Sequence, residues 1–171
     1  IQRAGMQVQA GFILGFDSDA GDVFDSLIQF IQHSGIVVAM VGLLNAPRGT
    51  KLYERLSREN RLTTVPTGDN TDCSMNFLPK MGQAELVAGY HRVMHTIYSQ
   101  RQYYQRVVRF LQNYHVAEDR KVRYRLREME AFVKSVWHMG IVGPGRRYYW
   151  RLVFWSLWKR QCLYMAVTMA I

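Results

Sequence analysis

Two apolar segments that flank one amphipathic stretch constrain the fold of this chain most strongly. Residues 6–16 alternate apolar and polar side chains and then become continuously apolar, which predicts a strand buried on both faces. Residues 36–44, IVVAMVGLL, form a second apolar run of strand length. The stretch between them carries one apolar stripe at helical spacing: Val23, Phe24, Leu27, Ile28 and Ile31. We therefore predict a βαβ unit with a right-handed crossover.

Both ends of the predicted helix carry residues that favour a helix terminus. Asp17, Ser18 and Asp19 offer side-chain oxygens that can act as N-caps, and Asp22 places negative charge in the first turn. Gly35 follows the apolar stripe and is the residue type that most often ends a helix. We therefore expect the helix to lie between these two groups.

The chain after the second predicted strand is polar and rich in turn-forming residues. The turn NAPRGT at residues 45–50 precedes a short helix predicted for residues 51–58. Residues 59–82 are rich in Thr, Asn, Asp, Gly and Pro and predict a long loop, which in compact domains is usually functional or a linker. We assign residues 1–82 to one domain of α/β type.

From about residue 84 the apolar spacing becomes helical and stays so. Helices are predicted near residues 86–97, 104–111 and 126–136, and GPG at residues 143–145 precedes a last helix that begins RRYYWRLVFWSLWKR. Residues 83–171 are therefore assigned to an all-α domain. The predicted fold class is α/β followed by all-α.

The net charge of +9 is concentrated in the second part of the chain. Residues 1–100 carry eight Lys or Arg and nine Asp or Glu, whereas residues 101–171 carry fourteen and four. The cations of the last stretch alternate with aromatic residues: Arg146, Arg147, Tyr148, Tyr149, Trp150, Arg151, Trp155, Trp158, Lys159 and Arg160. This pattern suits an anionic membrane surface or packing in a larger core. Nucleic-acid binding is less favoured because no RNP, KH or zinc-finger pattern occurs.

Cysteine and histidine spacing does not predict a metal site. Cys73 and Cys162 lie far apart without a CxxC motif, so a disulfide framework is not expected and the cytoplasm is the expected compartment. His91 and His95 lie one helical turn apart, but no third ligand follows nearby. We therefore assign no catalytic residue and no metal ligand within this chain.

The glycines of the first strand do not form a dinucleotide-binding fingerprint. Gly11 and Gly15 lie within or at the end of the predicted strand, not in a phosphate-binding turn. Glycine in a strand either marks a bend or lets a ligand or another backbone approach closely. Asn45 either starts a turn or faces the crevice where α/β folds bind ligands. Spacing alone leaves both interpretations open.

The segments GFILGFDSD and VGLLNAPRGTKLYERL together resemble the last two strands of a radical S-adenosylmethionine (SAM) barrel. In that family the fifth strand carries a GxIxG pattern, matched here by Gly11, Ile13 and Gly15, and the sixth ends in a turn that resembles APRGT. The acidic residue that commonly follows GxIxG has no exact counterpart here, and Asp17 and Asp19 are the two alternatives for its place. DNTDCSMNFLPKM and the helical stretch after it resemble the helical domain of a subgroup that has an amino-terminal cobalamin-binding domain. This subgroup includes hopanoid 2-methylase-like proteins.

The resemblance implies that residues 1–82 are the βαβα end of a TIM-like barrel. It implies reductive cleavage of SAM at a [4Fe–4S] cluster, with cobalamin in the full-length protein and methyl transfer to an unactivated carbon as the reaction. It also implies adenosine contacts, from Gly11, Ile13 and Gly15 on the fifth strand and from Leu44 and Asn45 at the end of the sixth.

The chain departs from this family in lacking the CxxxCxxC run that holds the cluster, and two cysteines cannot supply three thiolates. We therefore expect a fragment that is inactive alone, whose partner is the missing amino-terminal part of the same enzyme. An anionic membrane surface or a lipid substrate would suit the cationic aromatic helix, with the protein at the cytoplasmic face. The alternative is a non-catalytic helical binding module, membrane-peripheral or, less favoured, nucleic-acid-binding.

Overall fold

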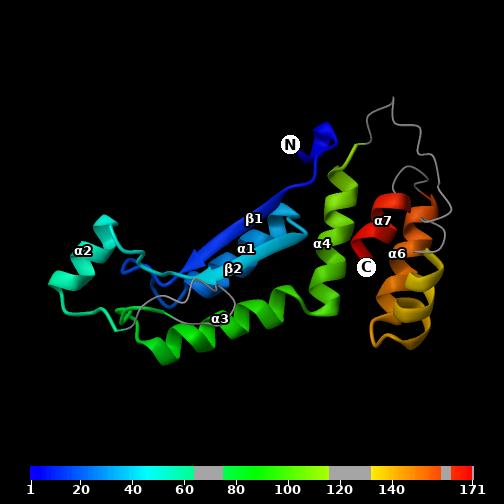
Figure 1. The fold of residues 1–171 in the computed structure, drawn as a ribbon. Helices are drawn as coiled ribbons and strands as arrows, with labels where there is room; N and C mark the ends of the chain where they lie inside the picture. The colour runs from blue at the N-terminus through cyan, green and yellow to red at the C-terminus, as the bar shows by residue number, and fades with distance from the viewer. Residues whose placement is uncertain (64–74, 116–131, 159–162, 171) are drawn as a thin grey trace. The chain divides into compact units, whose positions relative to one another are not determined.

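The computed structural model describes residues 1–63, 75–115, 132–158 and 163–170, which belong to two compact units (Figure 1). The sheet unit comprises Ala10–Ile31 and Ala39–Ile97. The helical unit comprises the described residues of Ile1–Gln9, Gln32–Val38 and Tyr98–Ile171. The chain is therefore mixed α/β with mostly helices, and each unit is described by itself.

The predicted βαβ unit is present. Strand β1 (Gln9–Leu14) and strand β2 (Val38–Leu43) form a two-stranded sheet, joined through helix α1 (Val23–Ser34). Figure 1 shows the two strands side by side and running in the same direction, with α1 returning the chain between them. Helix α1 ends before Gly35, as predicted.

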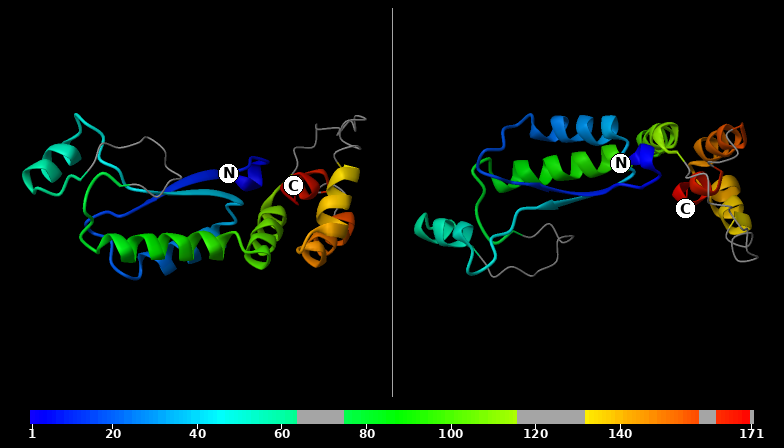
Figure 2. Two further views of the ribbon diagram at one scale, coloured as in Figure 1. Left: turned by 60° about the horizontal axis from the view of Figure 1, so that its bottom comes forward. Right: turned by 90° about the horizontal axis from the view of Figure 1, so that it is seen from above.

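Helices cover one face of this sheet. Figure 2 shows α1 and α3 (Gln83–Ile97) on the same side of the two strands. The ring of Phe12 on β1 meets Phe30 on α1 edge-on, with centroids 5.9 Å apart. The two helices approach closely because α3 has Gly89 opposite Phe24, where a Cβ atom would lie 2.2 Å from the ring. Burial of Leu14, Val41 and Leu43 against this helical layer supplies the apolar stabilisation of the unit.

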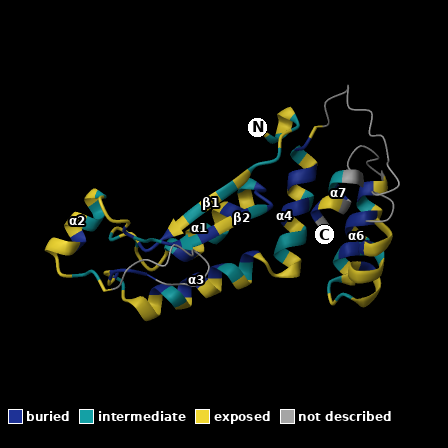
Figure 3. Cartoon of the chain, viewed as in Figure 1, coloured by how far each residue is buried: buried dark blue, intermediate teal, exposed yellow. Residues whose placement is uncertain are grey.

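The other face of the sheet is open, so the prediction of a first strand buried on both faces is wrong. Ile13 on β1 is 55% exposed and Met40 on β2 is 66% exposed. Figure 3 shows exposed positions along both strands. The reason is that, among the described residues, both covering helices pack on the opposite face. The strand is also shorter than the predicted range of residues 6–16. Met6 and Phe16 lie outside it, and both side chains are about half exposed.

The predicted N-caps of α1 are also wrong. The helix begins at Val23, and the carboxylates of Asp17 and Asp19 bond to other groups. Helix α2 (Lys51–Arg58) has the predicted bounds, and its N-cap is Thr50, whose hydroxyl accepts a hydrogen bond from the Tyr53 N–H at 3.2 Å.

The two ends of the predicted long loop are held together. Leu62 and Phe77 form an antiparallel bridge, and the Leu78 N–H donates to the Arg61 carbonyl at 2.8 Å. Phe77 also packs with Ala46 and Leu56 in a small buried cluster. The end of β2, helix α2 and residues 75–78 are thereby joined.

The helical unit contains α4 (Gln100–Asn113), the π-helix η2 (Val136–Val142), α6 (Arg146–Trp158) and α7 (Leu163–Ala170), with a short 3-10 helix η1 (Gln2–Ala4). Its buried core contains Val37, Val107, Phe110, Leu111, Tyr114, Leu152, Ala166 and Met169. Of the helix predicted near residues 126–136, the part before residue 132 lies outside the described residues. Residues 132–135 are helical and lead into η2.

Arg106 of α4 is buried in this unit at 1% exposure. Its Nη2 donates to the Val37 carbonyl at 3.2 Å, and its guanidinium lies 5.5 Å from the ring centroids of both Tyr98 and Tyr103. Burial lowers the pKa of Arg106 from its ordinary value. Within the described ranges, no helix has the length and apolar character needed to cross a bilayer.

Candidate functional site

The carboxyl ends of β1 and β2 meet at one edge of the sheet. The Leu44 N–H, just after β2, donates to the Leu14 carbonyl at 2.8 Å. The loop after β1 and the turn after β2 therefore begin next to each other, at the edge where α/β folds place their ligands.

The five residues predicted to contact adenosine are distributed around this edge. Gly11 and Ile13 lie on the open face of β1, and a Cβ atom at Gly11 would meet no atom of the described residues within 4 Å. Gly15 lies at the end of the strand, and a Cβ atom added there would lie 3.6 Å from the Leu44 Cβ. Asn45 follows Leu44 directly. The structure thus brings Gly15 and Leu44 together and leaves Gly11 and Ile13 accessible along the strand.

Gly15 has a structural requirement of its own. Its φ of +106° is a conformation that L side chains rarely adopt, and a Cβ atom there would lie 2.8 Å from the Leu86 Cδ2. Leu86 on α3 is fully buried. Glycine at this position is therefore needed for the chain to leave β1 and pass over α3.

Asn45 is held by a second asparagine that sequence reasoning missed. The Asn45 Oδ1 accepts from the Asn76 N–H at 3.2 Å. The fully buried Asn76 side chain accepts from the Ala46 N–H at 2.9 Å and donates to the Ala46 carbonyl at 2.7 Å. A polar residue within the apolar run Met75–Leu78 is the signal that points to such a buried amide, because a buried polar group needs partners.

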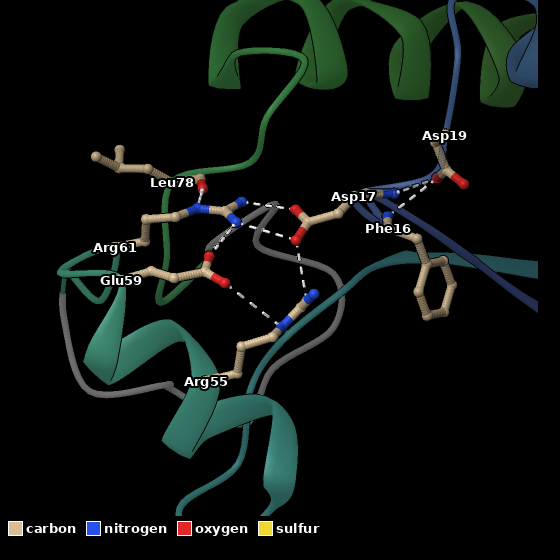
Figure 4. Close-up of polar contacts among 8 residues, drawn as sticks. Phe16, Asp17, Asp19, Arg55, Glu59, Arg61 and Leu78 are labelled. Carbon is tan, nitrogen blue, oxygen red and sulfur yellow. Dashed lines mark hydrogen bonds and ion pairs between the residues drawn. The ribbon is translucent and has the colours of Figure 1, made fainter.

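Charged side chains gather beyond the end of β1 (Figure 4). Asp17 pairs with Arg61 through Oδ1 to Nη2 at 2.7 Å and Oδ2 to Nη1 at 3.0 Å. The Arg55 Nη2 lies 2.9 Å from the same Oδ2. The Arg61 Nη1 also meets Glu59 at 2.8 Å, and its Nε donates to the Leu78 carbonyl at 2.8 Å. This network ties the loop after β1 to α2 and to the end of the long loop.

The network keeps Asp17 ionised. The hydrogen bonds from Arg61 lower the pKa of the Asp17 carboxyl below its ordinary value, against the opposing effect of burial. The charges of Arg61, Arg55 and Lys80 lower it further. The same contact with Asp17 raises the pKa of Arg61. Neither group is therefore suited to exchange a proton near neutral pH, which favours a positioning role.

Asp19 organises the turn itself. One oxygen, Oδ2, accepts from the Gly15 N–H at 2.9 Å and from the Phe16 N–H at 3.0 Å (Figure 4). The two alternative matches for the acidic residue after GxIxG thus have different partners. Asp19 bonds to the backbone of the motif, whereas Asp17 bonds to arginines.

The described residues do not fit an iron–sulfur cluster. Among them, no three His, Cys, Asp or Glu side chains lie together so that they could hold a metal ion. Cys73 and Cys162 lie outside the described residues. So do Asp69, Asn70 and Asp72, three turn-forming residues of the predicted long loop.

The basic aromatic segment divides between exposed and packed residues. Arg146, Arg147 and Arg151 are exposed, whereas Tyr149 is buried and the Trp150 Nε1–H donates to the Gly140 carbonyl at 2.9 Å. Partly buried Trp155 packs against the core. Lys159 and Arg160 lie outside the described residues, and so does the Trp158 side chain. Some of these aromatic residues therefore serve packing.

Comparison with known proteins gives one family and two relatives. Residues 50–171 match the family described as domain of unknown function DUF4070. An uncharacterized methyltransferase of Synechocystis sp. (strain ATCC 27184 / PCC 6803 / Kazusa) is 29% identical over 159 residues, which cover 90% of this chain and 29% of that protein. Hopanoid C-2 methylase of Rhodopseudomonas palustris (strain TIE-1) is 38% identical over 78 residues, 46% of this chain and 14% of that protein.

No solved structure matches the chain. The chain spans less than one third of the length of either curated relative.

Proposed function

The chain belongs to the DUF4070 family, and we propose that it works as the carboxyl-terminal part of a cobalamin-dependent radical SAM methyltransferase. The similarity to a protein named a methyltransferase along 90% of this chain carries the proposal. The family match and both relatives confirm the resemblance to hopanoid 2-methylase-like proteins that the two strand motifs indicate.

The open face of β1 supports an adenosine contact. Ile13 offers an exposed apolar side chain, and the adjacent Gly11 leaves free space beside the strand. A flat, largely apolar group such as adenine suits this exposed apolar surface. In the proposal Ile13 packs on adenine, Gly11 and Gly15 leave room, and Leu44 and Asn45 contact the nucleoside at the strand edge. When bound, SAM supplies the methyl group and the radical chemistry.

The charged network of Asp17, Asp19 and Arg61 holds the loop that follows β1 at this edge of the sheet. Asp19 holds the backbone of Gly15 and Phe16, while the Asp17–Arg61 pair anchors the rest of the loop. These residues position the edge and do not contact the ligand. In the proposal, the cluster ligands and the cobalamin site belong to other parts of the full-length enzyme, and these 171 residues are inactive alone.

The test is SAM cleavage by two proteins reconstituted with iron, sulfide and cobalamin under reducing conditions. The polypeptide of the complete gene is expected to produce 5′-deoxyadenosine, or to transfer the labelled methyl group of SAM to the added cobalamin and release S-adenosylhomocysteine. The 171-residue chain is expected to produce neither. Absence of both products from the complete polypeptide would overturn the proposed activity, and cleavage by the short chain would overturn the claim that it is inactive alone.

The adenosine contact has its own test in the complete polypeptide. Ile13→Asn is expected to raise the KM for SAM about tenfold by removing apolar contact, with a smaller effect on kcat. Leu78→Asn is the matched control, because Leu78 is 50% exposed in the same unit and lies outside the strands. An equal KM for the two variants would remove Ile13 from the proposed site.

A membrane-peripheral role is the second candidate, and the residue types of the helical unit favour it. Residues 132–158 contain Lys134, Arg146, Arg147 and Arg151 but no Asp or Glu. Trp137 is 58% exposed and Phe154 is 63% exposed. In this proposal the protein binds the cytoplasmic, anionic surface of a membrane through aromatic insertion and cationic attraction.

Flotation with vesicles of phosphatidylcholine and phosphatidylserine tests this role. Binding is expected to fall with added salt and in Trp137→Ala, and to persist in Met40→Ala, whose side chain is 66% exposed in the sheet unit. Flotation that is absent, or equal for both variants, would contradict this candidate.

A further inference from the structure

The helical unit contains a partly enclosed cavity that none of the proposals above uses. It lies among α4, the middle of η2, the turn at residues 143–145 and the first turns of α6, and its volume is about 140 Å³. All of these segments belong to the helical unit, so the cavity does not depend on how the two units are arranged.

The walls of this cavity are mainly aromatic and aliphatic, and Gln100 of α4 adds an amide side chain. Four tyrosines contribute, Tyr103 and Tyr104 from α4 and Tyr148 and Tyr149 from α6, together with aliphatic Val107 and Leu152. The rings of Tyr104 and Tyr148 lie 5.6 Å apart between centroids. The residues that line the cavity include no Asp, Glu, Lys or Arg. A charged ligand would therefore lose its hydration without a compensating partner.

The cavity has a buried floor and an accessible rim. Val107 is 0% exposed and Leu152 is 4% exposed, whereas Met139 is 39% exposed. A bound group would enter past Met139 and rest against the floor. Methionine suits such a rim because its flexible thioether adapts to differently shaped apolar groups.

Two of the four tyrosine hydroxyls already have partners. The Tyr103 hydroxyl donates to the Met169 carbonyl at 2.8 Å, and the Tyr149 hydroxyl shares a hydrogen bond with the Ser135 Oγ at 2.9 Å. Burial raises the pKa of Tyr103, so its phenol is neutral at neutral pH. Because these contacts fix both rings, the two tyrosines offer mainly their ring surfaces to the cavity.

We propose that this cavity binds a neutral hydrocarbon group about the size of a benzene ring, as the anchor for the apolar part of the methyl acceptor. The size is consistent with an apolar cavity of roughly 150 Å³ in another protein, which stays dry and binds benzene. Naming the group as part of the acceptor rests on the proposed methyltransferase function. Binding of the hydrocarbon group itself does not, since it depends only on the helical unit.

Toluene binding to the 171-residue chain tests the cavity. The measurement is an NMR titration with methyl-labelled methionine. The Met139 methyl signal is expected to shift and to show an NOE to toluene, whereas the signal of Met6, which is 52% exposed, is expected to stay unchanged. Equal shifts of both signals, or none, would overturn the cavity as a binding site.

A filling variant gives a second test. Met139→Trp places a larger side chain at the rim and is expected to weaken toluene binding at least about tenfold, while Met6→Trp, away from the residues that line the cavity, leaves it unchanged. If Met139→Trp does not fold, the wild-type NMR titration still decides the question.

The link to the acceptor is tested in the complete polypeptide. Met139→Trp is expected to raise the KM for the acceptor without changing the KM for SAM. Unchanged acceptor KM with lost toluene binding would overturn only the acceptor role. Absence of SAM cleavage by the wild-type polypeptide would instead contradict the proposed function. The result of the toluene titration would be unaffected by that outcome.

Discussion

The carboxylate of Asp17 and the guanidinium of Arg61 form two parallel contacts, at 2.7 and 3.0 Å. Arg61 has a side-chain exposure of 15% and Asp17 of 13%, so water screens the pair less than a surface ion pair. The pair joins two loops that are 44 residues apart in sequence. One of these loops follows the strand that carries Gly11, Ile13 and Gly15, so the pair influences the position of the candidate adenosine site.

Arg61→Ala should destabilise the protein by about 1–2 kcal/mol, because Asp17 and the Leu78 carbonyl lose hydrogen-bond donors. The free energy of unfolding from urea denaturation is the measurement. Arg58→Ala is the control, since Arg58 is exposed and, within the described part of the chain, donates a long hydrogen bond of 3.4 Å to the Glu54 carbonyl. Equal losses for the two variants would mean that the pair contributes no more than a surface arginine.

The Asp17 pair also predicts a pH dependence. The pKa of Asp17 is lowered in the folded state, so its stabilising effect is present above the unfolded-state pKa of about 4. It is lost as the pH falls from there through the lower folded-state pKa. The difference in free energy of unfolding between wild type and Asp17→Asn should therefore be constant from pH 7 to about pH 5 and shrink below about pH 4. A difference that stays constant to pH 2.5 would contradict this assignment.

Much of the sheet unit could be predicted from the sequence because its signals are local. The apolar runs and the stripe from Val23 to Ile31 predict β1, α1 and β2, and the bounds of α2 were predicted correctly. The helices α3, α4 and α6 also lie where apolar periodicity indicates them. Local spacing determines such elements because side chains three or four residues apart share a helix face.

The contacts that organise the candidate site could not be predicted in this way. Asp17 and Asp19 look like helix caps in sequence, but their partners are Arg61 and the backbone of Gly15. Asn76 meets Ala46 only because the chain folds back across 30 residues. The open face of β1 was missed for a related reason, since an apolar strand does not reveal on which side its helices pack. Those relationships depend on tertiary structure.

Two glycines of the GxIxG match should respond differently to alanine. Gly15→Ala introduces a side chain at φ +106° and 2.8 Å from Leu86, and should destabilise the protein by about 1–3 kcal/mol. Gly11→Ala meets nothing within 4 Å and should change stability by less than about 0.5 kcal/mol. Thermal and urea unfolding of both variants measure this contrast. A stable Gly15→Ala variant would mean that this turn can adopt another backbone conformation.

The Gly11→Ala variant also tests SAM binding independently of folding. In the complete polypeptide, Gly11→Ala should fold normally and yet raise the KM for SAM, because the added methyl group projects from the open face where the adenosine is proposed to lie. An unchanged KM in this stable variant would argue against adenosine contact at that point of β1.

Asn76→Leu should destabilise the sheet unit by about 1–3 kcal/mol, because the Ala46 N–H and carbonyl would lose their partners inside the protein. Leucine has nearly the shape of asparagine, so the change tests hydrogen bonding more than volume. Asn113→Leu is the matched control, since the Asn113 amide donates to the Arg109 carbonyl at 3.2 Å in an exposed position. The free energy of unfolding is again the measurement.

Asn76→Leu should also affect the candidate site, because the Asn76 N–H bonds to the Asn45 Oδ1 and the Asn76 side chain holds the backbone of Ala46, the residue after Asn45. Loosening that turn should raise the KM for SAM in the complete polypeptide at a temperature where the variant is fully folded. If Asn76→Leu is as stable as Asn113→Leu, the buried amide does not hold the turn after β2.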